Sequence, residues 1–433
     1  MDRREAVADA RYRYAQKNPA SRERFEAARA ALPGGNTRTV LFHEPFPLGI
    51  VRGDGCRVWD ADGHEYVNLV GEYTAGLFGH SNPVILAAVR RALDGGVTLS
   101  GHTMVEGPFA RAVSARFPSM ELLRFTNSGT EANLLALATA VLHTGRRRIL
   151  VFDGGYHGSV LSFHHALRTG GEPLNVPHEF VVGVYNDREG TEALIRQHAD
   201  QLAAVVVEPV LGSGGCIPGD PEFLAMLREQ TTAAGALLIF DEVMTSRLSA
   251  GGRQQELGIR PDLTTIGKYL GGGMSFGAFG GRREVMRRFD PTLPDAVAHA
   301  GTFNNNVLTM TAGLTAITEV YTPAAATALN ARGEQLRQRL SGLARAADVP
   351  MWVTGVGSMM AVHFTPAPPR CAADADAADP LLGELLFFDL LELGIHIAPR
   401  GMIALSLPVG DSECDALADA FAAFLTNRQP LLA

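Results

Sequence analysis

Lysine is rare in this chain, and one lysine stands in surroundings that favour covalent chemistry. The 433 residues contain 38 lysines and arginines, of which only Lys17 and Lys268 are lysine. Lys268 lies in TTIGKYLGGGMSFGAFGG, among apolar and very small residues. An amine in an apolar pocket loses its proton readily and can form a Schiff base, which a guanidinium cannot do. We expect this role for Lys268; a buried lysine in a salt bridge is the alternative.

A strand-to-helix junction offers a cradle for a phosphate. In FTNSGTEAN, the residues Ser128, Gly129 and Thr130 open a helix. Free backbone N–H groups, two hydroxyls and a residue without a Cβ, at the positive end of a helix dipole, suit a phosphate. The same residues could instead form an ordinary cap, with Glu131 in the first turn.

Further segments contain side chains that suit a flat, protonated heteroaromatic ring. In LLIFDEVMTSR, strand alternation puts Asp241 and Val243 on one side of the chain, so that the acid can pair with a ring nitrogen while the valine packs on the ring. In GGYHG, Tyr156 can stack on the opposite face, although a tyrosine after a strand is often simply core. Thr302 in GTFNNN offers another hydroxyl for a phosphate. Together with Lys268, these features indicate pyridoxal phosphate.

Composition and spacing disfavour several other functions. The net charge of −8 gives no general attraction to nucleic acid, and no stretch reaches the roughly 20 apolar residues of a membrane span. We expect a cytoplasmic chain that binds neither nucleic acid nor membranes. The spacing of His157, His164 and His165 matches no ligand motif, so we expect no metal. No strand runs into GxGxxG, which disfavours a nicotinamide dehydrogenase.

The elements that must position these residues alternate between short β-rich runs and helical stretches. The runs cover residues 122–126, 148–153, 180–186, 203–208, 236–241 and 263–267. This pattern predicts an α/β fold with a mainly parallel sheet covered by helices. Several runs end at polar residues, among them Glu208, Asp241 and Lys268, and ligands bind beyond the carboxyl ends of such strands.

The pattern changes near the ends of the chain. We expect a large domain that binds pyridoxal phosphate at residues 65–320, and a smaller α+β domain at 321–433 that the N-terminal segment 1–64 joins. The stretch at 364–380 is rich in Pro, Ala and Asp and should form an exposed loop.

Nearly the whole chain resembles the class III aminotransferases of PLP fold type I. The resemblance runs from PGGNTRTVLF at residue 33 through NSGTEAN, FDGGYHG, VEPV, FDEVMTSR and PDLTTIGKYLGGG to GTFNNN. It implies that Lys268 is the Schiff-base lysine and that Asp241 partners the pyridine nitrogen. The residues it implies for cofactor binding are Ser128, Gly129, Thr130, Tyr156, Glu208, Asp241, Val243, Lys268 and Thr302. The threonine that matches Thr302 reaches the phosphate of the neighbouring subunit, which implies an obligate homodimer with active sites at the interface.

Two branches of this class resemble different parts of the sequence. PGGNTR and GKYLGGG look most like the glutamate-1-semialdehyde aminomutases, but those have an acidic APS-x-FEA-type segment where this chain has IAPRGMIALSLP, with Arg400 and no acid. That pattern is similar to the β-phenylalanine aminotransferases, which use aromatic β-amino acids. Because guanidinium groups bind carboxylates with paired hydrogen bonds, Arg38 and Arg400 are candidates for the substrate carboxylates. Either could instead be a solvated surface arginine.

We therefore predict an aminotransferase that moves the amino group of an aromatic β-amino acid to 2-oxoglutarate or pyruvate. The alternatives are a glutamate-1-semialdehyde 2,1-aminomutase, which needs no added keto acid, and another class III ω-aminotransferase. A decarboxylase or epimerase of the same fold would release gas or racemise its substrate. A regulator of this fold without turnover usually has an added DNA-binding domain, which we do not expect before residue 33.

Overall fold

The computed structural model describes residues 2–163 and 174–432. The chain divides into two compact units. Unit 1 consists of Met1–Asn82, Ala331–Pro369 and Ala377–Ala433, and unit 2 of Pro83–Asn330 and Arg370–Asp376. The division expected from the sequence, with boundaries after residues 64 and 320, stays a prediction.

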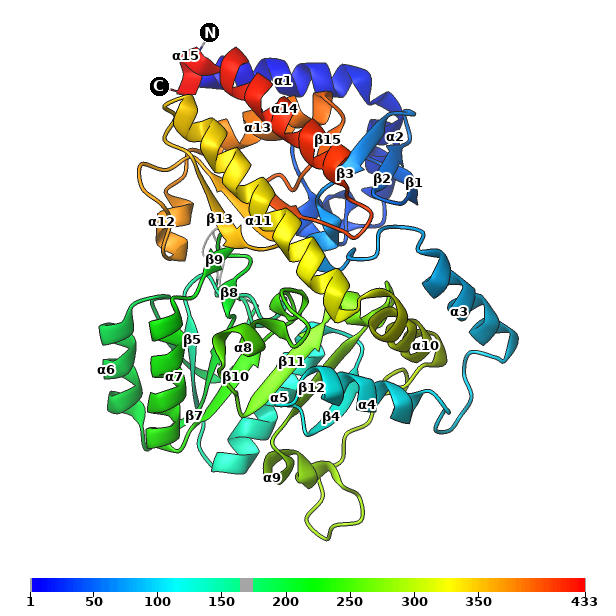
Figure 1. Ribbon diagram of the computed structural model, residues 1–433, viewed down its shortest axis with the longest axis vertical. Coiled ribbons are helices and arrows are strands. Elements are labelled where there is room, and N and C mark those ends of the chain that lie inside the picture. The colour runs from blue at the N-terminus through cyan, green and yellow to red at the C-terminus, as the bar shows by residue number, and fades with distance from the viewer. Residues whose placement is uncertain (1, 164–173, 433) are drawn as a thin grey trace. The chain divides into compact units, whose positions relative to one another are not determined.

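The centre of unit 2 is a seven-stranded sheet of order β4-β12-β11-β10-β7-β5-β6 (Figure 1). Its strands are β4 (Leu122–Thr126), β5 (Arg148–Phe152), β6 (Glu179–Gly183), β7 (Leu202–Val207), β10 (Leu237–Asp241), β11 (Leu263–Gly267) and β12 (Gly277–Gly281). Neighbouring strands are parallel except β12, which is antiparallel to both β11 and β4. The predicted α/β fold with a mainly parallel sheet is confirmed.

Helices cover both faces of this sheet because its strands are apolar on both sides. Ile149, Ala204 and Ile239 face α5, whereas their neighbours Leu150 and Val205 belong to a second core beneath α6 and α7. Figure 1 shows α6 and α7 side by side. The helices of unit 2 are α3 (Pro83–Asp94), α4 (Glu106–Arg116), α5 (Gly129–Thr144), α6 (Arg188–His198), α7 (Pro221–Ala234), α8 (Gly252–Leu257), α9 (Arg283–Met286), α10 (Val307–Thr315) and α12 (Ala372–Asp376). A short pair, β8 (Val210–Leu211) and β9 (Ile217–Pro218), follows β7.

Unit 1 contains two small sheets and the helices packed on them. One sheet has the order β1-β2-β3-β15 and the other β13-β14-β16. The strands are β1 (Ile50–Asp54), β2 (Arg57–Asp60), β3 (Glu65–Asn68), β13 (Trp352–Val356), β14 (Met359–His363), β15 (Ile395–His396) and β16 (Met402–Ala404). The helices are α1 (Arg3–Lys17), α2 (Pro19–Ala28), α13 (Pro380–Glu392), α14 (Asp411–Asn427) and α15 (Gln429–Leu432), and α11 (Pro323–Ala346) leads into the unit from residue 331.

One local prediction is wrong. Residues 364–380 do not form only an exposed loop, because α12 (Ala372–Asp376) lies within them. Ala372 is buried in the core of unit 2, and the Asp374 carboxylate accepts the backbone N–H groups of Arg370 and Cys371 at the start of the helix. Tertiary packing thus decides the conformation of a segment whose composition is typical of loops.

Two further findings concern the described residues only. Among them, every helix is too short or too polar to cross a bilayer. The same residues contain no cluster of three or more His, Cys, Asp or Glu side chains that could hold a metal ion. His164 and His165, which the sequence analysis considered, lie outside the described residues. The expected cytoplasmic location stays a prediction.

Candidate active site

Most of the predicted residues of unit 2 gather at one edge of the large sheet. Because β4, β7, β10 and β11 run in the same direction, their carboxyl ends meet at that edge. Ser128 follows β4, Glu208 follows β7, Asp241 ends β10 and Lys268 follows β11. The strand order therefore brings together residues that are up to 140 positions apart in the sequence.

The first turn of α5 lies directly against the end of β10. Ser128 is the N-cap of α5, and its hydroxyl accepts the Glu131 N–H at 3.2 Å. A Cβ added to Gly129 would come within 2.9 Å of Val243 Cγ2, and one added to Gly267 within 3.4 Å of the Gly129 nitrogen. The two glycines therefore let three parts of the chain approach closely. These parts are the first turn of α5, Val243 and Gly267, the residue before Lys268. The cap and the phosphate cradle are compatible, since the N–H groups of Gly129 and Thr130 need no partner within the helix.

Asp241 is held rigidly in a buried network. It is only 3% exposed, and its Oδ2 lies 2.7 Å from Nδ1 of His157 and accepts the Asn133 amide at 2.8 Å. Its Oδ1 accepts the backbone N–H of Val243 at 3.0 Å. Asn133 is itself fixed, because its Oδ1 accepts the Thr265 hydroxyl at 2.7 Å. This arrangement fixes the orientation of the Asp241 carboxylate.

Glu208 anchors the loop that presents Tyr156. Its carboxylate accepts the Tyr156 N–H at 2.9 Å and the Gly212 N–H at 3.1 Å. Burial raises the pKa of Glu208 to about 7, against the opposing charge of His157 and with support from Asp241. Burial lowers the pKa of His157, but the hydrogen bond and negative charge of Asp241, together with the negative charge of Glu208, raise it by more. Glu208, His157 and Asp241 therefore interact electrostatically within the site.

Lys268 occupies an unusual backbone position. Its φ is +53°, in the left-handed region, and it opens a 3-10 turn, Lys268–Gly271, directly after β11. This conformation costs a residue other than glycine on the order of 1–3 kcal/mol, and such residues cluster at functional sites. Lys268 thus lies at the carboxyl ends of the strands, on a backbone that the neighbouring structure holds in place.

These features fit pyridoxal phosphate. The N–H groups of Gly129 and Thr130 have no acceptor within α5 and can bind a phosphate, the buried Asp241 carboxylate is available for a ring nitrogen, and the half-buried Val243 and the exposed Tyr156 offer surfaces for the two ring faces. Lys268 supplies the amine. The assignment of these roles to single residues stays a prediction.

The structure does not bring every predicted residue to this edge. Thr302 is exposed in a loop next to the site, where Asn304 Oδ1 accepts the Asn127 amide at 2.9 Å. Arg38 and Arg400 belong to unit 1. Arg38 Nη1 donates to Glu72 Oε2 at 2.6 Å, and Arg400 lies on the surface of that unit after β15.

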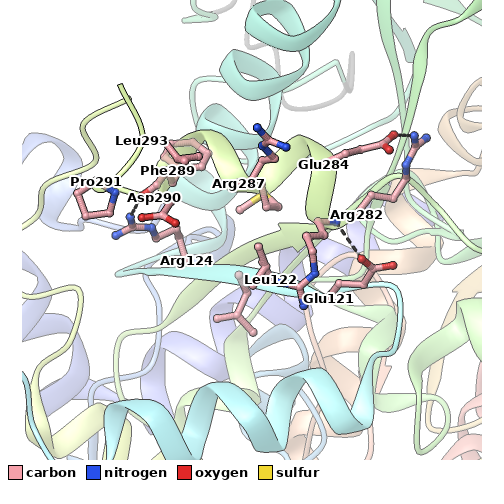
Figure 2. A pocket seen from close by; sticks show the side chains of 13 residues that line it. Glu121, Leu122, Arg124, Arg282, Glu284, Arg287, Phe289, Asp290, Pro291 and Leu293 are labelled. Carbon is pink, nitrogen blue, oxygen red and sulfur yellow. Dashed lines mark hydrogen bonds and ion pairs between the residues drawn. The ribbon is translucent and has the colours of Figure 1, made fainter. Parts of the chain in front are cut away.

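A separate pocket of about 860 Å³ opens at the opposite edge of the sheet, where β4 begins and β12 ends (Figure 2). Two of its arginines have partners: Arg282 pairs with Asp262 at 2.6 Å, and Arg124 donates to the carbonyl of Phe289. Its lining includes none of the predicted site residues. We therefore assign the chemistry to the strand ends and not to this pocket.

Sequence reasoning missed the residues that hold Asp241 in place. Asn133 and Thr265 were not singled out, and His157 was considered only as a metal ligand. Asn133 stands in the same NSGTEAN motif as the phosphate cradle, and His157 in the same GGYHG motif as Tyr156. The concentration of polar residues in these motifs was the available signal.

Comparison with known proteins identifies the class. The family model described as aminotransferase class III matches residues 42–425. The chain therefore belongs to the class III aminotransferases, and it is a transaminase that depends on pyridoxal phosphate. The resemblance noted in the sequence is confirmed.

Several curated relatives and solved structures resemble the chain over nearly its whole length. The chain is 52% identical to a β-phenylalanine transaminase of Variovorax paradoxus over 428 residues, 99% of this chain and 98% of the relative. The crystal structure of the β-phenylalanine aminotransferase from V. paradoxus matches with a TM-score of 0.97 and covers 99% of both chains. A glutamate-1-semialdehyde 2,1-aminomutase of Sorangium cellulosum is 39% identical over 93% of this chain and 94% of its own. A solved transaminase with bound PLP matches with a TM-score of 0.86 at 34% identity, over 96% of this chain and 98% of its own.

Proposed function

We propose that this transaminase takes an aromatic β-amino acid, such as 3-amino-3-phenylpropanoate, as amino donor and 2-oxoglutarate or pyruvate as acceptor. The observation that carries the proposal is the likeness to the β-phenylalanine transaminase over nearly the whole chain, which exceeds the likeness to the aminomutase. Arg400 stands where the aminomutases have an acidic segment. An arginine at this place supports the proposal that a second substrate with a carboxylate binds there.

The residues at the strand ends have different roles in the proposed reaction. Lys268 would hold the cofactor through Nζ, the first turn of α5 would hold its phosphate, and Asp241 would face its ring nitrogen. When bound, the cofactor supplies a carbonyl that condenses with amines and a ring that withdraws electrons. Lys268 Nζ then moves the proton of the amine-bearing carbon of the donor. Asp241, positioned by Asn133 and His157, would keep the ring nitrogen protonated.

A donor assay tests the substrate class. Purified enzyme loaded with pyridoxal phosphate is incubated with 2-oxoglutarate and one of three amines: 3-amino-3-phenylpropanoate, α-phenylalanine or 1-phenylethylamine. We expect glutamate to form fastest with the β-amino acid, and the same order of donors when pyruvate replaces 2-oxoglutarate and alanine is measured. Faster turnover of α-phenylalanine would contradict the proposed donor. Turnover of glutamate-1-semialdehyde without added keto acid would favour the aminomutase.

Arg38 and Arg400 are proposed to bind the substrate carboxylates. Replacing either with glutamine should raise the KM for at least one carboxylate substrate about tenfold or more, because a charge-assisted hydrogen-bond pair is lost. Steady-state kinetics measure this, with 1-phenylethylamine as a donor that has no carboxylate and should be little affected. Arg57→Gln is a matched control, since Arg57 is an exposed, ion-paired arginine of the same unit. Unchanged KM values for both substrates in both variants would contradict the assignment.

We also propose that two copies of the chain form a homodimer through the face around Thr302. Met104 is 91% exposed and Phe303 is 56% exposed, which is unusual for large apolar side chains. Asn305 joins the two segments by hydrogen bonds to the Gly101 carbonyl at 3.4 Å and to Glu106 at 3.3 Å. A second copy would cover these side chains and receive Thr302 at its own phosphate site, as the resemblance implies.

Sedimentation tests the dimer. The wild-type protein should sediment at twice the chain mass of 46.2 kDa. Phe303→Asp should shift it toward the single-chain mass, because a charge buried in an apolar interface has no partner. Leu142→Asp, at an exposed leucine on α5, is the control and should stay dimeric. A wild-type protein of single-chain mass would contradict the proposal.

A further inference from the structure

Four consecutive residues of unit 1 adopt left-handed backbone conformations. They are Gly71, Glu72, Tyr73 and Thr74, with φ values of +52°, +49°, +50° and +81°. Their place is fixed by close packing, since a Cβ on Gly71 would lie 2.6 Å from the carbonyl oxygen of Ala404 in β16. Three adjacent residues other than glycine rarely take this conformation, and strain of this kind points to a function for what the segment presents.

The strained segment presents a carboxylate to a proposed substrate arginine. Glu72 Oε2 accepts a hydrogen bond from Arg38 Nη1 at 2.6 Å, and the next residue, Tyr73, donates from its hydroxyl to the Val40 carbonyl at 2.7 Å. Burial raises the pKa of Tyr73, while the positive charges of Arg400 and Arg38 lower it and that of Glu72 raises it. Both candidate arginines and Glu72 therefore act electrostatically on a single phenol.

Another ion pair of unit 1 shows how the Arg38–Glu72 pair differs from an ordinary surface pair. Arg57 and Glu65 are 2.8 Å apart with side chains 42% and 45% exposed, compared with 47% and 46% for Arg38 and Glu72. The Arg57–Glu65 pair lies on the regular strands β2 and β3 and needs no unusual backbone. Glu72, in contrast, is brought to Arg38 by the strained segment.

We propose that Glu72 is a specificity-determining residue whose carboxylate occupies the Arg38 guanidinium until the carboxylate of an incoming amino or keto acid displaces it. The inference rests on the proposed function, in which Arg38 binds a substrate carboxylate. An arginine fork donates two hydrogen bonds to one carboxylate, so Glu72 and the substrate compete for Arg38. The competition lowers the affinity for each carboxylate ligand by a small factor, because exposed ion pairs are weak. It also lets one arginine release the first product before the second substrate binds.

A binding experiment tests the competition without turnover. The probes are 3-phenylpropanoate and glutarate, which have carboxylates but no amine or keto group, and their Kd values are measured by calorimetry on the holoenzyme. Glu72→Gln should lower the Kd of the probe that Arg38 binds by about two- to fivefold. The KM of the corresponding substrate should fall with it, while kcat stays nearly unchanged. Glu65→Gln removes an equivalent exposed charge and should change neither value.

The same experiment in an Arg38→Gln background distinguishes a failure of this proposal from a failure of the proposed function. There, Glu72→Gln should have no effect; a gain in affinity that persists would come only from removing a negative charge and would overturn the proposal. Weaker or unchanged binding in Glu72→Gln alone would also overturn it, since Glu72 would then orient Arg38 or be irrelevant. If Arg38→Gln by itself leaves both Kd values unchanged, the assignment of Arg38 in the proposed function fails instead.

Discussion

Lys268→Ala is expected to lower kcat by about 10⁴-fold or more, because the variant loses both the amine that holds the cofactor and the base that moves the substrate proton. The fold should survive. Alanine tolerates the +53° φ no worse than lysine does, and the side chain at this position is only half-buried. We expect the free energy of unfolding to change by no more than about 1 kcal/mol. Steady-state kinetics and urea unfolding of the same preparation measure the two effects.

The chain contains its own control for this experiment. Lys17 is the other lysine, and it forms an exposed ion pair with Glu392 at 2.6 Å in unit 1. Lys17→Ala should retain wild-type kcat. Measurable transamination by Lys268→Ala, beyond the background of free pyridoxal phosphate, would contradict the role of Lys268 as the base.

Asp241→Asn has the second largest expected effect, a loss in kcat on the order of 10²–10³-fold. The amide has no negative charge, so it cannot keep the ring nitrogen of the cofactor protonated. The change also takes the anion away from the buried His157, which lies 2.7 Å from Asp241. We expect the variant to bind pyridoxal phosphate more weakly, and equilibrium dialysis of the cofactor alongside kcat measures both consequences.

Asp262→Asn is the matched control for Asp241→Asn. Asp262 is equally buried, but it pairs with Arg228 at 2.9 Å and Arg282 at 2.6 Å just before β11 begins. This variant should be less stable than the wild type, since it leaves buried or half-buried charges without their partner. Its kcat per folded molecule should be retained. If both variants lose activity equally, the effect of Asp241→Asn is structural and the assignment fails.

Much of the large sheet could be predicted because buried parallel strands are short runs of branched apolar residues. AAVVV in β7 and LLIF in β10 are such runs. β12 has the sequence GAFGG and could not be recognised, because glycine is unfavourable in strands. The structure explains the glycines: a Cβ on Gly277 would lie 2.1 Å from the Ser128 carbonyl oxygen, and one on Gly281 2.1 Å from that of Asp262. Close backbone approach, not strand propensity, selects glycine at these positions.

The residues that carry the chemistry of the site were easier to predict than the residues that hold them in place. Lys268, Asp241 and the phosphate cradle could be named because their residue types are unusual where they stand. The hydrogen bond between Thr265 and Asn133 joins residues 132 positions apart, and no sequence pattern states which face of α5 meets β11. The Arg38–Glu72 pair likewise depends on a left-handed segment that contains only one glycine.

The absorbance spectrum of the purified enzyme tests the central claim most directly. We predict a visible band from the cofactor bound to Lys268, which disappears when 3-amino-3-phenylpropanoate is added and returns when 2-oxoglutarate or pyruvate follows. A band that ignores the β-amino acid but responds to other amines would contradict the proposed donor. The absence of any band, even after pyridoxal phosphate is supplied, would contradict the role of Lys268 and the account built on it.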